Sequence, residues 1–131
     1  MKSDATSQKK NRIKPAEPGR HAEKINILKD RVLEGPGHSD PRLRQAVAHR
    51  VAAHAGALPK DDARLPPEIG RYIDKIALHA YRVTDTDIEA LRAARYSEDI
   101  IFELTVSAAL GAGMARLKRG LSALTGGEDA A

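Results

Sequence analysis

The chain of 131 residues contains no cysteine and no tryptophan, and it has only one phenylalanine and three tyrosines. Without cysteine there can be no disulfide, no thiolate metal site and no thiol chemistry. A core this poor in aromatic side chains has to be built from aliphatic residues and alanine, which suits helix-on-helix packing better than a β-sandwich. Strands with convincing alternation are also missing. The sequence therefore predicts an all-α fold.

The first twenty residues contain no apolar run, so we expect no signal peptide and, by default, a cytoplasmic protein. They hold six basic residues and two acidic ones, which accounts for the whole net charge of +4. The basic residues are Lys2, Lys9, Lys10, Arg12, Lys14 and Arg20, and the acidic ones are Asp4 and Glu17. We expect residues 1–20 to form a disordered, solvated tail. Without aromatic residues or a recognition fold, nucleic-acid binding is the weaker interpretation.

With 41% hydrophobic residues, the chain has room for one domain, which we place at 21–125, followed by a flexible C-terminus at 126–131. Start and stop signals predict three helices in its first part. The first runs from His21 to Leu33, before the Gly35-Pro36-Gly37 turn. The second begins at Asp40-Pro41 and ends at Gly56. The third opens at Pro66-Pro67 and runs to Ala80.

Two further helices are signalled between Val83 and Leu124. Thr84 and Asp87 have the spacing of a capping box, which predicts a helix from about Asp85 to Ala94. Ser97 is the expected N-cap of the next helix, with two acidic residues in its first turn. Because the chain must turn between these helices, we expect Arg95 to adopt the left-handed conformation that usually requires glycine.

The last helix carries only one charge, Glu103, between Ile100 and Ala115, so it should be buried on most sides. One stripe consists of small residues, Ala108, Gly111, Ala112 and Ala115. A second consists of Leu110, Met114, Leu117, Leu121 and Leu124. These stripes fit either a core helix, which we favour, or a subunit interface. The uncharged run is too short, and too closely flanked by charge, for a membrane span of about 20 apolar residues.

The segment from Val83 to Leu124 resembles the alkylhydroperoxidase-D-like or carboxymuconolactone decarboxylase family. The resemblance is carried by Val-Thr-Asp-x-Asp from Val83, by the Leu91-Arg92-x-Ala94 pattern, by Ser97-x-Asp99 and by the Ala-rich helix that follows. Weaker agreement extends over 33–37 and 40–44. The resemblance implies a compact alkylhydroperoxidase-D-like bundle that assembles as a trimer or hexamer. This chain has Arg95 where the family pattern has glycine.

The peroxidase branch of that family uses a glutamate, a Cys-x-x-Cys pair and a histidine. Threading this spacing onto the chain places Glu68 at the acid, Ala80 and Val83 at the cysteines, and Asp87 at the histidine. A second alignment places the segment after the signature, and both alignments leave the redox centre missing. In a thiol peroxidase, one thiolate attacks the peroxide and a second thiol resolves the sulfenic acid. No other side chain can perform both steps, so we exclude thiol peroxidase activity.

The decarboxylase branch needs proton transfer and charge stabilisation but no thiol. The residues available for that work are His79, Tyr81, Arg82 and Glu103. The plainer interpretation is that His79 bonds carbonyl groups at a helix end and that Tyr81 is a core residue with its hydroxyl at the surface.

No metal or cofactor is predicted from the remaining residues. His49 and His54 are five residues apart on one helix and point to different faces. Gly111-Ala112-Gly113 lies within a helix and so does not form a phosphate-binding loop.

Three hypotheses of function remain, and the least specific is an interaction protein that binds partners through its basic tail. The first is a catalytically reduced structural or regulatory subunit of a helical oligomer, formed with further copies or with a cysteine-bearing relative. The alternative is a cysteine-independent enzyme of the carboxymuconolactone decarboxylase type. A pocket enclosing His79, Tyr81 and Glu103 would favour the enzyme, and an exposed apolar patch on the last helix would favour the subunit.

Overall fold

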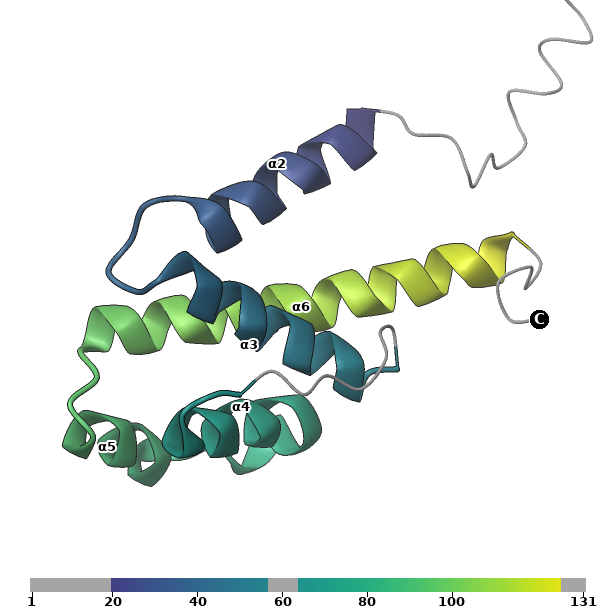
Figure 1. Ribbon diagram of the computed structural model, residues 1–131. Helices are drawn as coiled ribbons and strands as arrows, with labels where there is room; N and C mark the ends of the chain where they lie inside the picture. The colour runs from purple at the N-terminus through teal and green to yellow at the C-terminus, as the bar shows by residue number, and fades with distance from the viewer. Residues whose placement is uncertain (1–19, 57–63, 126–131) are drawn as a thin grey trace, which may run out of the picture.

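A computed structural model describes residues 20–56 and 64–125, and every regular element in these ranges is helical (Figure 1). The elements are α2 (Arg20–Glu34), α3 (Pro41–His54), α4 (Pro67–His79), a 3-10 turn η1 (Ala80–Arg82), α5 (Asp85–Ala93) and α6 (Glu98–Leu124). The all-α prediction is confirmed. The predicted tail, apart from Arg20, and the predicted C-terminus at 126–131 lie outside the described residues.

The predicted helix ends agree with the structure to within one or two residues. The second helix ends at His54, two residues before Gly56, whose φ of 79° turns the chain. The third ends at His79, so that Ala80 begins the 3-10 turn instead. The fourth ends at Ala93, and Ala94 is its C-cap.

Three predicted helix caps are confirmed. The Asp40 side chain accepts a hydrogen bond from the Arg42 N–H at 2.9 Å, at the start of α3. Asp87 accepts from the Thr84 N–H at 2.8 Å and completes the capping box of α5. The Ser97 hydroxyl oxygen accepts from the Ile100 N–H at 3.2 Å, at the start of α6. These bonds satisfy amide groups that the first turns leave without intrahelical partners.

The turn between α5 and α6 adopts the predicted left-handed conformation, with a φ of 75° at Arg95. The Arg95 N–H donates to the Arg92 carbonyl oxygen at 2.9 Å, and the Tyr96 N–H donates to the Leu91 carbonyl oxygen at 3.1 Å. This is the Schellman pattern, in which a left-handed residue ends a helix. Tyr96 then packs against the core cluster, which includes Leu91.

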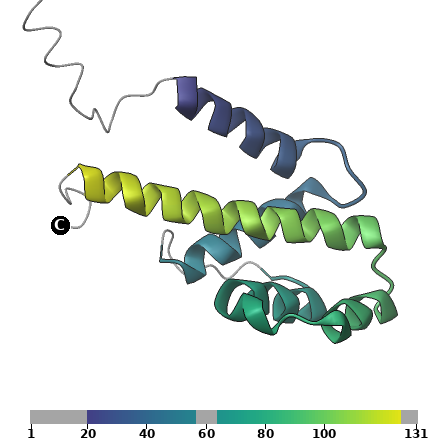
Figure 2. The same ribbon diagram turned by 180° about the vertical axis from the view of Figure 1, so that it is seen from behind.

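The long helix α6 organises the fold (Figures 1 and 2). It packs against α3, with α2 on one side and α4 and α5 on the other. The buried core is aliphatic except for one tyrosine. Its members are Val47, Val51, Ile69, Tyr72, Ile73, Leu91, Ile101, Leu104 and Ala108. The Tyr72 hydroxyl is paired with that of Thr105 at 2.8 Å, so the only aromatic core residue in the described ranges keeps a polar partner.

The small-residue stripe of α6 faces α3. Ala108 is fully buried, Ala115 is 2% exposed, and Gly111 lies against the α3 backbone. This part of the helix therefore belongs to the core of the single chain.

Candidate functional site

The structure does not bring the predicted catalytic residues together. His79 ends α4, and its ring lies edge-on to that of Tyr81 with centroids 6.1 Å apart. The Arg82 guanidinium carbon lies 5.7 Å from the centre of the same Tyr81 ring. Glu103, in the second turn of α6, instead binds the loop between α2 and α3.

Tyr81 was expected in the core, and that prediction is wrong because the residue is 80% exposed. It falls in the 3-10 turn after α4, where its ring packs against His79 and Arg82 and not against the interior.

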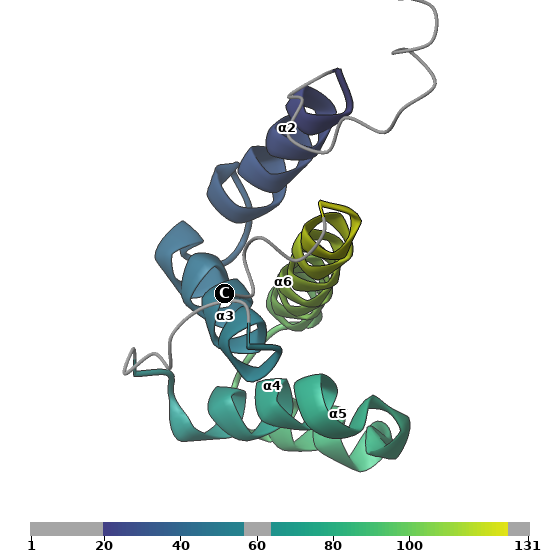
Figure 3. The ribbon, with the colours of Figure 1, turned by 90° about the vertical axis from the view of Figure 1, so that its right-hand side faces the viewer.

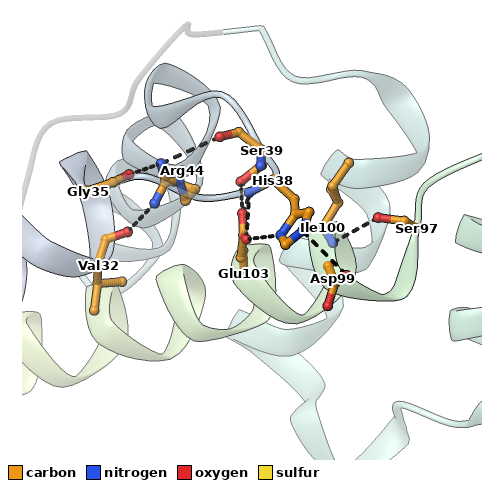
Figure 4. Close-up of polar contacts among 9 residues, drawn as sticks. All are labelled: Val32, Gly35, His38, Ser39, Arg44, Ser97, Asp99, Ile100 and Glu103. Carbon is orange, nitrogen blue, oxygen red and sulfur yellow. Dashed lines mark hydrogen bonds and ion pairs between the residues drawn. The ribbon is translucent and has the colours of Figure 1, made fainter.

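The Glu103 carboxylate is enclosed by the loop that precedes α3 (Figure 4). One oxygen accepts from the Ser39 N–H at 2.8 Å and from the Ser39 hydroxyl at 2.5 Å. The other accepts from the His38 N–H at 2.8 Å and lies 3.2 Å from His38 Nδ1. His38 Nε2 lies 3.6 Å from the Asp99 carboxylate. These contacts tie a loop to a helix more than sixty residues further along the chain.

The same contacts set the ionisation of Glu103. Burial alone would raise the pKa of this carboxyl, but the hydrogen bonds from His38 and Ser39 outweigh it and lower the pKa to about 2. A carboxyl with so low a pKa is a poor general acid or base near neutral pH. The geometry of Glu103 therefore favours a structural role over the proton transfer considered from the sequence.

Arg44 supports the loop from the other side (Figure 4). It is 3% exposed, and its guanidinium donates to the Val32 carbonyl oxygen at 2.8 Å and to the Gly35 carbonyl oxygen at 2.6 Å. These carbonyl groups lie at the C-terminal end of α2, where a helix leaves acceptors without partners. This role of Arg44 was not predicted from the sequence, where the residue lies in the segment 40–44 that weakly agrees with the family pattern.

A second polar cluster joins α3 to α4. Asp74 accepts from Arg50 Nε at 2.8 Å and Nη2 at 2.7 Å, and it lies 2.8 Å from His54 Nε2. The hydrogen bond from Arg50 is the main cause that lowers the pKa of Asp74. Lys75 binds Asp87 at 2.9 Å and so links α4 to the capping box of α5.

The four residues that the family alignment placed at the acid, cysteine and histidine positions make structural contacts in this protein. Glu68 accepts a hydrogen bond from the Tyr96 hydroxyl at 3.0 Å, and Asp87 is held by Thr84 and Lys75. Ala80 lies in the 3-10 turn and Val83 packs at the edge of the core. Within residues 20–56 and 64–125, no three His, Cys, Asp or Glu side chains are grouped so as to hold a metal ion.

A shallow groove of about 240 Å³ lies between α2 and α6, over α3. It is lined by Lys29, Leu33, Gln45, Ala48, His49, Ala52, Leu110, Gly111 and Met114. His79, Tyr81 and Glu103 take no part in it. Leu110 and Met114, two of the predicted interface residues, are therefore half-buried inside the chain, whereas Leu117, Leu121 and Leu124 are exposed.

No described helix lies over the side of α6 turned away from α3 (Figures 2 and 3), and this side carries apolar residues, of which Val106 is half-buried. We call this side the outer face. It consists of Phe102, Val106, Ala109, Gly113, Leu117, Gly120 and Leu124, flanked by Glu98 and Arg116. Phe102 is 68% exposed and Leu124 is 55% exposed. A Cβ added at Gly113 or Gly120 would meet no atom within 4 Å.

By length and composition, α6 alone among the described helices is long and apolar enough to cross a membrane, with a mean hydropathy of 1.5 over its best window. The expectation that the uncharged run is too short to span a bilayer concerned only part of α6, whose full length is 27 residues. Core helices of soluble proteins meet the same criterion, and a third of the window is buried inside this chain. The finding by itself does not place the protein in a membrane.

Comparison of the chain with protein-family models, with characterised proteins and with solved structures gave no match.

Proposed function

We propose that this protein is a catalytically reduced, alkylhydroperoxidase-D-like subunit with a structural or regulatory role in a cytoplasmic helical oligomer. The outer face of α6 is the observation that carries the proposal. A single exposed apolar residue needs no explanation, but Phe102, Leu117 and Leu124 recur on one side of one helix together with small residues. Burying such a face in an interface removes apolar surface from water.

Two observations favour a subunit over an enzyme. The chain has no cysteine, and the residues at the threaded redox positions hold helices and caps together. His79 and Tyr81 lie at the end of α4 without Glu103, whose carboxylate is already enclosed by the α2–α3 loop. Within the described parts of the chain, the candidate residues of the decarboxylase alternative are therefore not assembled into one site.

The proposal is tested by measuring the molar mass of the full chain by light scattering across the micromolar range. We expect at least a dimer, formed either by this chain alone or with a cysteine-bearing relative of the same family. A monomer at high micromolar concentration that also fails to bind such a relative would contradict the proposal.

A matched pair of variants tests whether the outer face of α6 forms the interface between subunits. Leu117→Asp places a charge on the outer face and is expected to weaken assembly. Lys118→Asp alters the next residue, which is exposed but points about 100° away around the helix, and should have a smaller effect. Equal effects of the two variants would mean that assembly uses another surface.

A further inference from the structure

We propose that two copies of this chain pair through the outer face of α6 in an antiparallel arrangement, with Glu98 of each copy facing Arg116 of the other. This inference rests on the proposed function and deepens it, since it names a second copy as the partner and fixes the register of the two helices.

The charges on the outer face select the antiparallel direction. Glu98 and Arg116 lie about five turns apart and so occupy the same angular position on the helix. In a parallel pair related by a two-fold axis, the same flank of the two copies lies on opposite sides of the pair. Glu98 and Arg116 would then stay about 27 Å apart along the axis and form no ion pair. In an antiparallel pair related by a two-fold axis, residues on the same flank meet, so each glutamate faces an arginine.

Neither Glu98 nor Arg116 has its charge fully balanced within the described chain, so both can form an ion pair with a second copy. Glu98 and Glu89 share a single guanidinium, that of Arg92, so this end of the helix keeps an excess of negative charge. The Glu98 side chain is also 73% exposed. Arg116 forms no ion pair with any residue in the described parts of the chain.

The shape of the outer face fits the same register. With Glu98 opposite Arg116, the exposed Phe102 ring of one copy meets the other copy beside Gly113, where no side chain occupies the surface. The two-fold axis generates this contact twice. Val106 and Ala109 lie near the axis, where small side chains allow two helices to approach closely. The paired segments, residues 98–116, are about 27 Å long, so that Leu117 lies at the edge of the pair and Leu124 lies beyond it.

Shifting the register by one heptad would place Phe102 against Gly120, which also lacks a side chain. However, that shift moves Arg116 opposite Val106 and removes both ion pairs. The charges therefore distinguish two registers that shape alone would allow. Viewed nearly along α6, the outer side of the helix is open to such a partner (Figure 3).

Disulfide trapping tests the register directly, because a cysteine introduced into this cysteine-free chain has no competing thiol. In the proposed pair, the two copies of residue 106 are offset by about 3 Å along the helix axis, and the two copies of residue 113 by about 18 Å. Under mild oxidation of the full chain, Val106→Cys should form a covalent dimer at least about ten times faster than Gly113→Cys. A mixture of Phe102→Cys and Gly113→Cys should also cross-link, since these positions are opposite each other.

Charge reversal provides an independent test that leaves the cysteine-free chain intact. Glu98→Arg and Arg116→Glu should each raise the dissociation constant about tenfold, because each variant alone places like charges opposite each other twice. Mixing the two variants should restore association to near the original strength, since both ion pairs form again, one of them with reversed polarity.

The outcomes separate this inference from the proposed function. Association without Val106→Cys cross-linking, or equal cross-linking of Val106→Cys and Gly113→Cys, would overturn the antiparallel register but leave an oligomeric subunit. A monomer under all conditions would overturn both. Co-sedimentation of the chain with phosphatidylcholine vesicles in place of Val106→Cys cross-linking would show that a lipid surface covers the outer face, and would also overturn the pairing.

Discussion

Gly111 of α6 lies directly against the backbone of Ala48 in α3. A Cβ at Gly111 would meet the Ala48 carbonyl oxygen and would lie 2.9 Å from the Ala48 Cα. The two helices can cross this closely only because residue 111 has no side chain. We therefore expect Gly111→Ala to lower the free energy of unfolding by about 2 kcal/mol, because the helix backbones must move apart. Urea unfolding followed by circular dichroism would measure the change.

Gly120→Ala is the matched control for that substitution. Gly120 lies in the same helix, but a Cβ there would meet no atom within 4 Å. Alanine should raise the free energy of unfolding by up to about 1 kcal/mol because of its higher helix propensity. If both variants were stabilised, the close crossing of α3 and α6 at Gly111 would be incorrect.

The pKa of about 2 at Glu103 predicts how stability depends on pH. Because the pKa is lower in the folded state than the usual value of 4.5, the carboxylate stabilises the fold fully above about pH 5, and this contribution is lost as the pH falls towards 2. Glu103→Gln should lower the free energy of unfolding at pH 7 by about 2 kcal/mol, since an amide leaves donors of His38 and Ser39 poorly paired. The variant should also lose the part of the acid dependence that Glu103 contributes between pH 5 and 2, while Asp74 and Asp87, whose pKa values are also lowered, retain theirs.

Glu89→Gln serves as the control for the pH series. Glu89 is exposed and forms a surface ion pair with Arg92, so its removal should change stability by less than about 0.5 kcal/mol. A Glu103→Gln variant with the same acid dependence as the unaltered chain would contradict the assignment of this dependence to the Glu103 contacts.

The helix caps were predictable because their determinants are local. The side chains of Asp40, Asp87 and Ser97 accept hydrogen bonds from amide groups two or three residues away, so the spacing along the sequence is enough to predict these contacts. The left-handed turn at Arg95 was predictable for the same reason, since two adjacent helix signals left only that position for the turn.

The Glu103 contacts were not predictable from spacing. The carboxylate binds His38 and Ser39 at a separation of 65 and 64 residues, and the pairing depends on how α3 crosses α6. The exposure of the leucine stripe was likewise not predictable from spacing alone. Periodicity showed that α6 is apolar on several sides, but only the packing of α2 shows that Leu110 and Met114 line a groove while Leu117 stays exposed.

We expect the purified protein not to reduce hydrogen peroxide or organic hydroperoxides with any dithiol donor. The chain has no cysteine to form the thiolate that attacks the peroxide or the thiol that resolves the sulfenic acid. The measurement is peroxide consumption against a heat-denatured control, with contaminating peroxidases excluded. Turnover above that control would overturn the catalytically reduced assignment.

Arg95 has a φ of 75° at the junction of α5 and α6, a conformation that costs a residue with a Cβ roughly 1 kcal/mol. Glycine adopts this conformation without that cost, so we expect Arg95→Gly to stabilise the protein slightly, even though glycine gives the unfolded chain more freedom. Ala90→Gly is the internal comparison, because Ala90 lies within α5, where glycine should cost about 1 kcal/mol. Thermal unfolding of the two variants should therefore move the midpoint in opposite directions. A similar loss of stability in both would mean that α5 continues through Arg95 as an uninterrupted helix, and that the break aligned with the glycine of the family pattern does not exist.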